Sequence, residues 1–167
     1  MELRFTKMHS LGNDFILIDN RVLSLKKINQ LSKALCDRRF GIGADQLLLL
    51  NNSKMADFKM RIFNADGTEA EMCGNGIRCL AKYVWDKKVE SQKSKVKSQG
   101  SGVRSQKLSM ETLAGIIYLE KKGKLIKVNM GEPILEPVKI PVKIEVRKIR
   151  SYEDKNFSTS QLLNLQA

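Results

Sequence analysis

The sequence is short of the residues that hold metals and disulfides, since it has one histidine and three cysteines in 167 residues. A zinc site needs closely spaced Cys or His ligands, and no such pair occurs, so we expect no metal. Three cysteines are an odd number without the spacing of a disulfide framework, which favours reduced thiols. The disulfide-rich and zinc-stabilised classes of small protein are therefore excluded.

Long hydrophobic runs are also missing, and none approaches the roughly 20 residues that a helix needs to cross a bilayer. Residues 1–7 alternate apolar and polar side chains and lack the apolar core of a signal peptide. The hydrophobic content of 42% suits one well-cored domain in a chain of this length. We therefore expect a cytoplasmic protein without a membrane partner.

Acidic residues are scarce relative to basic ones, and the net charge is +12. Half of the excess lies in residues 87–107, which hold seven basic residues and one acidic residue. This segment repeats Val-x-Ser-Gln at a period of seven, and one apolar position in seven cannot form a coiled-coil seam. We expect a basic, low-complexity surface insertion there.

A basic arm that binds nucleic acid is the functional alternative for residues 87–107. No aromatic residue is interleaved there for stacking on bases, which argues against a nucleic-acid partner. Binding with a steep salt dependence, abolished by deleting the segment, would support that alternative.

Cys73 stands immediately before the strongest amphipathic pattern in the chain. The apolar stripe recurs at helical spacing and consists of Ile77, Leu80, Ala81, Val84 and Trp85. Gly74, Asn75 and Gly76 lie where this helix begins, and Asn75 is the expected cap. Unpaired N–H groups at a helix start favour a reactive thiolate, and the two glycines leave them open to a ligand carboxylate. The alternative is a buried, purely structural cysteine.

The remaining patterns predict several strands and one further helix. A helix over residues 25–37, with Ser24 as its possible cap, is indicated by its apolar face. Polar turn formers predict a loop at residues 9–14. Alternating or continuous apolar residues predict strands at 2–7, 15–19, 47–50, 58–64, 107–113, 115–120 and 125–130.

Four ordered blocks of this sequence resemble diaminopimelate epimerases. The blocks read FTKMH with LGNDF (5–9 and 11–15), GIGADQ (41–46), RIFNADG (61–67) and MCGNG (72–76). Two later stretches, ETLAG (111–115) and VNMGEP (128–133), resemble the same family. The likeness covers about residues 4–86 and 108–137, and four blocks in one order are far more specific than a single motif.

The resemblance implies an α+β fold, in which an antiparallel sheet wraps around a central helix as one of two pseudo-symmetric halves. It implies an enzyme that interconverts LL- and meso-2,6-diaminopimelate, in lysine and cell-wall precursor synthesis, without a cofactor or metal. By the same resemblance, Cys73 is one of two catalytic cysteines. The substrate would be held by Asn13, Gln46, Asn64, Gly74 and Asn75.

The chemistry of these side chains agrees with that implication. Removing an α-proton without pyridoxal phosphate leaves a poorly stabilised carbanion, so the site must hydrogen-bond the carboxylate densely and exclude water. Amide side chains donate hydrogen bonds without adding charge. Each also has a structural interpretation, because Asn13 and Asn64 suit turns and Gln46 can cap a loop. Roles in turns, rather than in proton transfer, are expected for Asp14, Asp45 and Asp66.

The sequence departs from the family pattern after Pro141. Inverting a stereocentre needs an acid and a base on opposite faces, and the family takes its second cysteine from a second half. Neither Cys36 nor Cys79 precedes a glycine-rich loop. We therefore expect an N-terminal epimerase-like domain at 1–141, a non-family tail at 142–167, and no C-terminal catalytic half.

Such a chain is expected to be inactive alone, or to need a partner. The partner would be a complementary C-terminal half, or a second copy that places two Cys73 thiols face to face. Two other isomerases remain as alternatives. The first is an isomerase of the same fold that uses a carboxylate base, but this sequence has Cys73 where that base would stand. The second is a proline- or hydroxyproline-racemase-like enzyme, which shares the cysteine pair but lacks the Gln46 and Asn64 blocks. A non-catalytic remnant or basic binding module is the alternative from another class.

Overall fold

The structure is a computed structural model that describes residues 3–23, 25–89 and 106–133. The chain divides into two compact units, Met1–Met130 and Gly131–Ala167, and all described elements belong to the first. Most of the predicted insertion at 87–107, the predicted cap Ser24 and the predicted tail at 142–167 lie outside the described residues.

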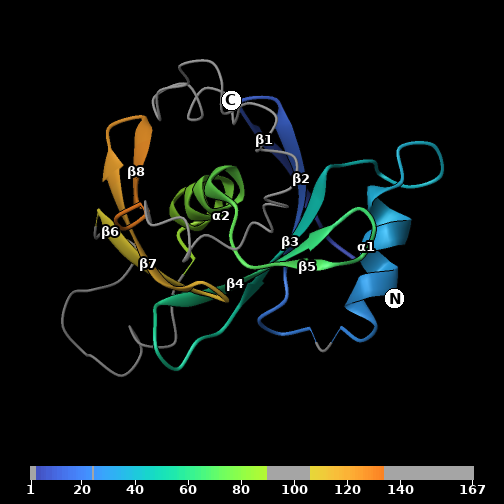
Figure 1. Ribbon diagram of the computed structural model, residues 1–167, viewed down its shortest axis with the longest axis horizontal. Coiled ribbons are helices and arrows are strands. Elements are labelled where there is room, and N and C mark those ends of the chain that lie inside the picture. Colours follow the sequence, from blue (N-terminus) through green and yellow to red (C-terminus); the bar gives the residue numbers. More distant parts are fainter. Residues whose placement is uncertain (1–2, 24, 90–105, 134–167) are drawn as a thin grey trace, which may run out of the picture. The chain divides into compact units, whose positions relative to one another are not determined.

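The first unit is a curved sheet with one helix on each face (Figure 1). The helices are α1 (Ile28–Cys36) and α2 (Gly74–Asp86). The strands are β1 (Thr6–Ser10), β2 (Asn13–Asp19), β3 (Gln46–Asn51), β4 (Phe58–Asn64), β5 (Glu69–Ala70), β6 (Lys107–Thr112), β7 (Gly115–Lys122) and β8 (Leu125–Asn129).

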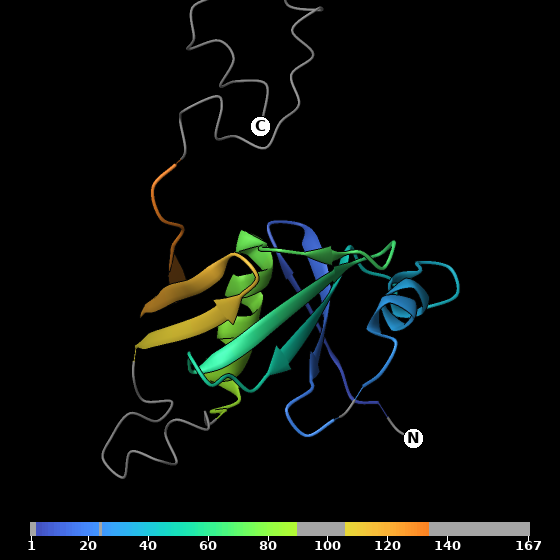
Figure 2. The same cartoon turned by 60° about the horizontal axis from the view of Figure 1, so that its bottom comes forward.

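The sheet curls around α2 as a half-barrel, with the strands in the order β1-β2-β3-β4-β6-β7-β8. The short β5 pairs with β4 to one side of this path. Figures 1 and 2 show α2 inside the curve, while α1 lies against the outer surface of the sheet. The α+β fold with a sheet around a central helix is therefore confirmed.

The sheet is mixed, whereas the family resemblance implied an antiparallel one. The pairs β2–β3 and β4–β6 are parallel, and the other pairs are antiparallel. Each parallel pair is joined by a long connection that contains a helix, α1 in the first case and α2 in the second. Such helical crossovers are what brings consecutive strands into parallel alignment.

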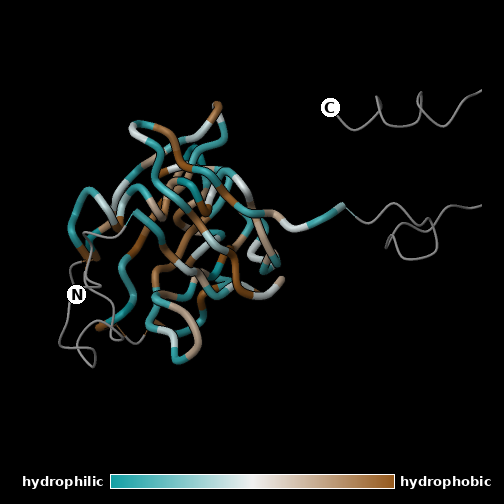
Figure 3. The backbone as a smooth tube through the Cα atoms, turned by 90° about the vertical axis from the view of Figure 1, so that its left-hand side faces the viewer, coloured by the Kyte–Doolittle hydropathy of each residue, from teal (hydrophilic) through white to brown (hydrophobic). Residues whose placement is uncertain are grey.

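Two apolar clusters explain why β2 and β3 read as unbroken hydrophobic runs. Alternate side chains of residues 47–50 point to opposite faces of the sheet, so all four residues are buried. Leu48 and Leu50 belong to the cluster around α2, while Leu47 and Leu49 belong to the cluster under α1. A strand covered on both faces needs apolar residues at every position. Figure 3 shows hydrophobic residues concentrated along the strands and helix in the middle of the tube.

The predicted stripe on α2 is confirmed as the centre of the core. Its five apolar side chains are all buried against the inner face of the sheet, Trp85 being the most exposed at 8%. Removing one of these side chains would leave a cavity between the helix and strands on both sides of it.

The predicted loop at residues 9–14 is wrong, because β1 continues to Ser10 and β2 already begins at Asn13. Leu11 and Gly12 alone make the turn, and both have positive φ angles, 54° and 87°. Two residues in this conformation match the twist of an antiparallel hairpin. The consequence is that Asn13 sits on a strand, where its side-chain direction is fixed.

The helix α1 is shorter than predicted and starts at Ile28 after Lys27, which has a φ of 52° and no side-chain cap. Ser32 on its inner face is fully buried, and its hydroxyl donates a hydrogen bond to the backbone carbonyl oxygen of Asn64 over 2.8 Å. The helix α1 is thereby attached to the end of β4.

Candidate active site

Cys73 is the N-cap of α2, a place that the sequence analysis assigned to Asn75. Its backbone is extended, and its Sγ accepts a hydrogen bond from the Gly76 N–H over 3.4 Å. Asn75 is the second residue of the helix, after Gly74. A sulfur atom at this position takes up one of the N–H groups that the first turn leaves without helical partners.

Gly76 explains how the start of α2 comes so close to the sheet. A Cβ at this position would lie 3.1 Å from the Leu48 side chain and 3.4 Å from the Phe15 ring. Gly74 differs, because a Cβ there would meet only the Arg78 guanidinium, at 3.9 Å. The glycine at 76 therefore allows close packing, while the backbone at Gly74 has only the end of the Arg78 side chain beside it.

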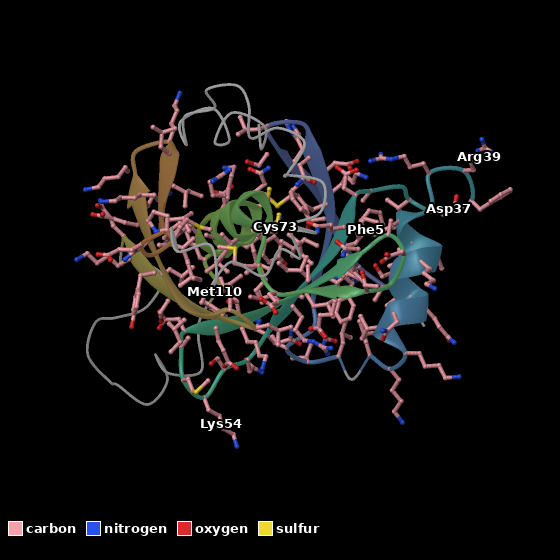
Figure 4. All side chains as sticks on the ribbon, in the orientation of Figure 1. Phe5, Asp37, Arg39, Lys54, Cys73 and Met110 are labelled. Carbon is pink, nitrogen blue, oxygen red and sulfur yellow. The ribbon has the colours of Figure 1, made fainter. Side chains whose placement is uncertain are left out.

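The Asn13 side chain lies beside the Cys73 thiol. Its Nδ2 lies 3.9 Å from the Cys73 Sγ, in the range of a hydrogen bond to sulfur. Its Oδ1 is buried and has no hydrogen-bond partner. A buried acceptor that no protein group satisfies is available to a hydrogen-bond donor of a ligand or of water. Figure 4 shows Cys73 at the start of α2, on the inner side of the sheet.

Gln46 and Asn64 form a second amide pair on the adjacent strands. They lie opposite each other in the β3–β4 register, and the Gln46 Nε2 donates to the Asn64 Oδ1 over 2.7 Å. The Gln46 Oε1 is buried and has no partner, as is true of the Asn13 Oδ1. These amides bond to each other rather than to Cys73.

The sheet register brings the three amides to the same end of neighbouring strands and to the same face of the sheet. Phe15 pairs with Gln46 and Gln46 pairs with Asn64, so β2, β3 and β4 all have a site residue at this end. Alternation along the strands puts Asn13, Gln46 and Asn64 on the side of α2, because their second neighbours Phe15, Leu48 and Ile62 belong to the α2 cluster. The sequence-predicted residues are thus gathered at the helix start.

Arg78 was not predicted as part of this region. Its guanidinium donates to the Asn75 Oδ1 from the next turn of α2, at a spacing of three residues that places the two side chains on one helix face. The signal was present in the sequence as a cation inside the first turns of the helix after Cys73. Its effect is to hold the Asn75 amide in place beside the open Gly74 backbone.

A charged cluster joins the chain next to Asn13 to the chain next to Gln46 through Asp14 and Asp45. Asp14 and Asp45 each accept a hydrogen bond from the other's backbone N–H, over 2.9 and 3.0 Å. Arg38 pairs with both carboxylates at 2.7 and 2.8 Å, and Lys7 pairs with Asp14 at 2.9 Å. Both carboxylates thus hold neighbouring chain segments together, although Asp14 lies on β2 and not in a turn.

We predict that this cluster makes the fold sensitive to acid. Arg38 and Lys7 hold the pKa of the Asp14 carboxyl well below its usual value of 3.8. A lowered folded-state pKa gives stability that is present above the unfolded-state pKa and is lost as the pH falls below it. Urea unfolding between about pH 5 and pH 2 should therefore show a steeper loss of stability for the wild type than for Asp14→Asn. Equal slopes for the two proteins would contradict this role.

The two other thiols are kept from reacting by burial. Cys36 and Cys79 are 2% and 3% exposed, whereas Cys73 is half-buried. Burial raises the pKa of the Cys79 thiol to about 11 and also raises the pKa of Cys36. A neutral, buried thiol is a poor nucleophile.

We therefore predict that one thiol per folded chain reacts with iodoacetamide near neutral pH. Peptide mass spectrometry should locate the modification at Cys73, and unfolding in urea should make all three cysteines reactive. Modification of Cys36 or Cys79 at the rate of Cys73 in the folded protein would contradict the assignment.

Within the described ranges, no cluster of His, Cys, Asp and Glu side chains is arranged to hold a metal ion. None of the helices in those ranges combines the length and the apolar character needed to cross a membrane.

Comparison with known proteins identifies the family. The family description "Diaminopimelate epimerase" matches residues 5–136. A curated diaminopimelate epimerase of Caldanaerobacter subterraneus subsp. tengcongensis is 52% identical over 151 residues, which cover 87% of this chain and 50% of the relative. One from Methanococcus maripaludis strain C5 is 50% identical over 145 residues, covering 84% of this chain and 48% of the relative.

Solved structures give weaker likenesses. A Bacillus anthracis phenazine biosynthesis protein of the PhzF family has a TM-score of 0.48 at 16% identity, covering 75% of this chain and 38% of its own. A hydroxyproline epimerase from Agrobacterium vitis also has a TM-score of 0.48, at 14% identity, with 72% and 38% covered. The chain spans about half the length of the curated relatives that it matches. By its match over residues 5–136 and its identity to these relatives, the chain belongs to the diaminopimelate epimerase family.

Proposed function

We propose that this chain supplies one half of a diaminopimelate epimerase site, which converts LL-2,6-diaminopimelate to the meso form without a cofactor or metal. The observation that carries the proposal is the position of Cys73, whose thiol lies at the start of α2 with the Asn13 amide 3.9 Å away. The reaction belongs to lysine and peptidoglycan precursor synthesis, and we propose a cytoplasmic location for it.

In this proposal the first turn of α2 binds the carboxylate of the reacting amino-acid centre. With no Cβ at Gly74, the carboxylate can approach the backbone N–H groups of Gly74 and Asn75, next to the Arg78 guanidinium. These donors and the positive end of the helix dipole stabilise the negative charge that develops when the α-proton leaves. Cys73, on the same turn, then lies within reach of that proton.

The amides of Asn13, Gln46 and Asn64 complete the substrate contacts in this proposal. The buried oxygens without partners on Asn13 and Gln46 are suited to accept hydrogen bonds from the substrate. Because these side chains are neutral, they bind the substrate without shifting the balance of charge at the thiol.

Inversion also needs an acid on the opposite face of the α-carbon. The sequence has three cysteines, and Cys36 and Cys79 are buried, so neither thiol can face Cys73 across a substrate. We propose that the second acid comes from a complementary C-terminal half. A second copy of this chain is the other candidate, since a two-fold axis would bring two Cys73 thiols together.

The test is α-proton exchange by the reduced chain with LL-2,6-diaminopimelate in D2O, followed by proton NMR and by separation of the LL and meso forms. We expect either deuterium incorporation without inversion, or activity only when a complementary half is added. Exchange with full inversion by this chain at low concentration would show that no partner is needed. Absence of exchange and inversion even with a complementary half would overturn the proposed function.

A further inference from the structure

A chain of four side chains runs away from the proposed site along the turn after β4. The Gln46 Nε2 donates to the Asn64 Oδ1 over 2.7 Å, and the Asn64 Nδ2 lies 2.9 Å from the Thr68 Oγ1. The Thr68 Oγ1 in turn lies 2.6 Å from the Asp66 Oδ1. Asp66 and Thr68 are exposed at the turn, while the Gln46 end of the chain is buried.

The direction of every hydrogen bond in this chain follows from its last member. An ionised carboxylate only accepts, so the Thr68 hydroxyl must donate its single proton to Asp66. The lone pairs of that hydroxyl are then left to accept from Asn64, which must present its NH2 group to Thr68. The side-chain oxygen of Asn64, Oδ1, therefore faces Gln46 and accepts from the Gln46 NH2 group.

The result reaches the site because an amide has two chemically different ends. With one N–H of its NH2 group donated to Asn64, Gln46 has its carbonyl oxygen as the buried atom that lacks a partner. If the chain ran in the opposite direction, that oxygen would face Asn64 and the NH2 group would take its place. The charge on Asp66 thus decides which end of the Gln46 amide is turned away from Asn64.

The backbone around the turn keeps the four groups in place. Asp66 also accepts from the Thr68 N–H over 2.8 Å, and the Asn64 N–H donates to the Thr68 carbonyl over 2.8 Å. On the other side of the sheet, the Ser32 hydroxyl donates a hydrogen bond to the backbone carbonyl of Asn64. The Thr68 N–H bond to Asp66 and the Asn64 N–H bond to the Thr68 carbonyl already close the turn through backbone N–H groups, so the Asn64 side-chain contact to Thr68 is additional to them.

We propose that Asp66 and Thr68 are positioning residues, which orient the amides of Asn64 and Gln46 so that Gln46 offers its carbonyl oxygen to a hydrogen-bond donor of the ligand. The part that concerns the ligand rests on the proposed function. The orientation itself is a property of this chain and is measurable without any ligand.

The test uses the side-chain amide signals of Asn64 and Gln46 in the 15N-labelled full chain. The key variant is Thr68→Val, which keeps the shape of the side chain and removes the hydroxyl. We expect it to accelerate exchange of the Asn64 NH2 protons by at least about tenfold and to shift the Gln46 NH2 signals, since the chain is broken at its second bond. Thr68→Ser, which retains the hydroxyl, should keep both signals close to wild type.

Two further arms separate this effect from a general loosening of the fold. Thr112→Val removes a hydroxyl that donates to the Gly115 carbonyl over 2.8 Å, away from the site, and should leave the Asn64 and Gln46 signals unchanged. Asp66→Asn lets the last group donate as well as accept, and should broaden or split the Asn64 amide signals as both directions become populated.

Ligand binding is measured on the same samples by titration with LL-2,6-diaminopimelate. We expect Thr68→Val to weaken binding about tenfold and Thr68→Ser to restore it. Amide signals that are the same in Thr68→Val as in wild type would overturn the inference, whatever the ligand does. Amide signals that respond as expected, in a wild-type protein that binds no diaminopimelate even with a complementary half present, would overturn the proposed function and leave the orientation of the amides standing.

Discussion

Replacing Cys73 by Ala should reduce α-proton exchange by at least about 100-fold, because the proposed base is removed. The variant should still fold. The Cys73 side chain is half-buried at the margin of the core cluster, and its hydrogen-bond partners are the Gly76 N–H and the Asn13 amide, so the loss should be close to the 1 kcal/mol or so of a helix cap. Exchange is followed as loss of the α-proton NMR signal of LL-2,6-diaminopimelate in D2O.

The assay is best run on a chain that is certain to meet a second half. Joining the full chain to the part of the Caldanaerobacter relative that this chain does not cover would provide one, and Cys73→Ala is then compared in that fusion. Cys36→Ala is the matched control, because Cys36 lies in the cluster under α1 on the other face of the sheet. It should lower stability and keep the exchange rate. Wild-type exchange in Cys73→Ala would refute the assignment of Cys73.

The elements with strong periodicity could be predicted from the sequence. The strand at 58–64 alternates in the sequence and forms with those bounds, and the apolar stripe after Cys73 becomes the buried face of α2. In both segments the pattern of burial is determined by one uninterrupted contact with the core. Local sequence then contains the whole signal.

The elements that depend on distant partners could not be predicted. The loop expected at 9–14 is a tight hairpin, because pairing of β1 with β2 through Ser10 and Asn13 outweighs the turn preference of the polar residues. The parallel pairs depend on where α1 and α2 return the chain to the sheet, which no single segment encodes. Tertiary contacts override local propensity in each case.

The site shows the same division. The position of Cys73 before a helix followed from the glycines and the stripe, but its role as the cap itself depends on Gly76 contacting Leu48 and Phe15. The pairing of Gln46 with Asn64 is set by the β3–β4 register, which the sequence of either strand alone does not contain. The family resemblance supplied what pattern reasoning could not, namely that these amides belong to one site.

Replacing Gly67 by Ala should be among the most destabilising small changes in the protein, for two separate reasons. Gly67 has a φ of 83°, which costs a residue with a Cβ about 1–2 kcal/mol. A Cβ there would also lie 2.6 Å from the Asn29 carbonyl oxygen and 2.9 Å from the Lys33 side chain, both on α1. Since the Asn29 oxygen is backbone, α1 itself must move, which we expect to add about 1–3 kcal/mol.

Gly12→Ala separates these two contributions, because Gly12 has nearly the same φ, 87°, and nothing within 4 Å of its added Cβ. Urea unfolding should therefore show a loss of roughly 1–2 kcal/mol for Gly12→Ala and of roughly 2–5 kcal/mol for Gly67→Ala. Movement of α1 would also loosen the hydrogen bond from Ser32 to the backbone carbonyl of Asn64. Of the two variants, Gly67→Ala alone should therefore increase exchange of the Asn64 side-chain NH2 protons. Equal losses in the two variants would mean that α1 absorbs the added carbon freely, and that it does not hold the Asn64 turn in place.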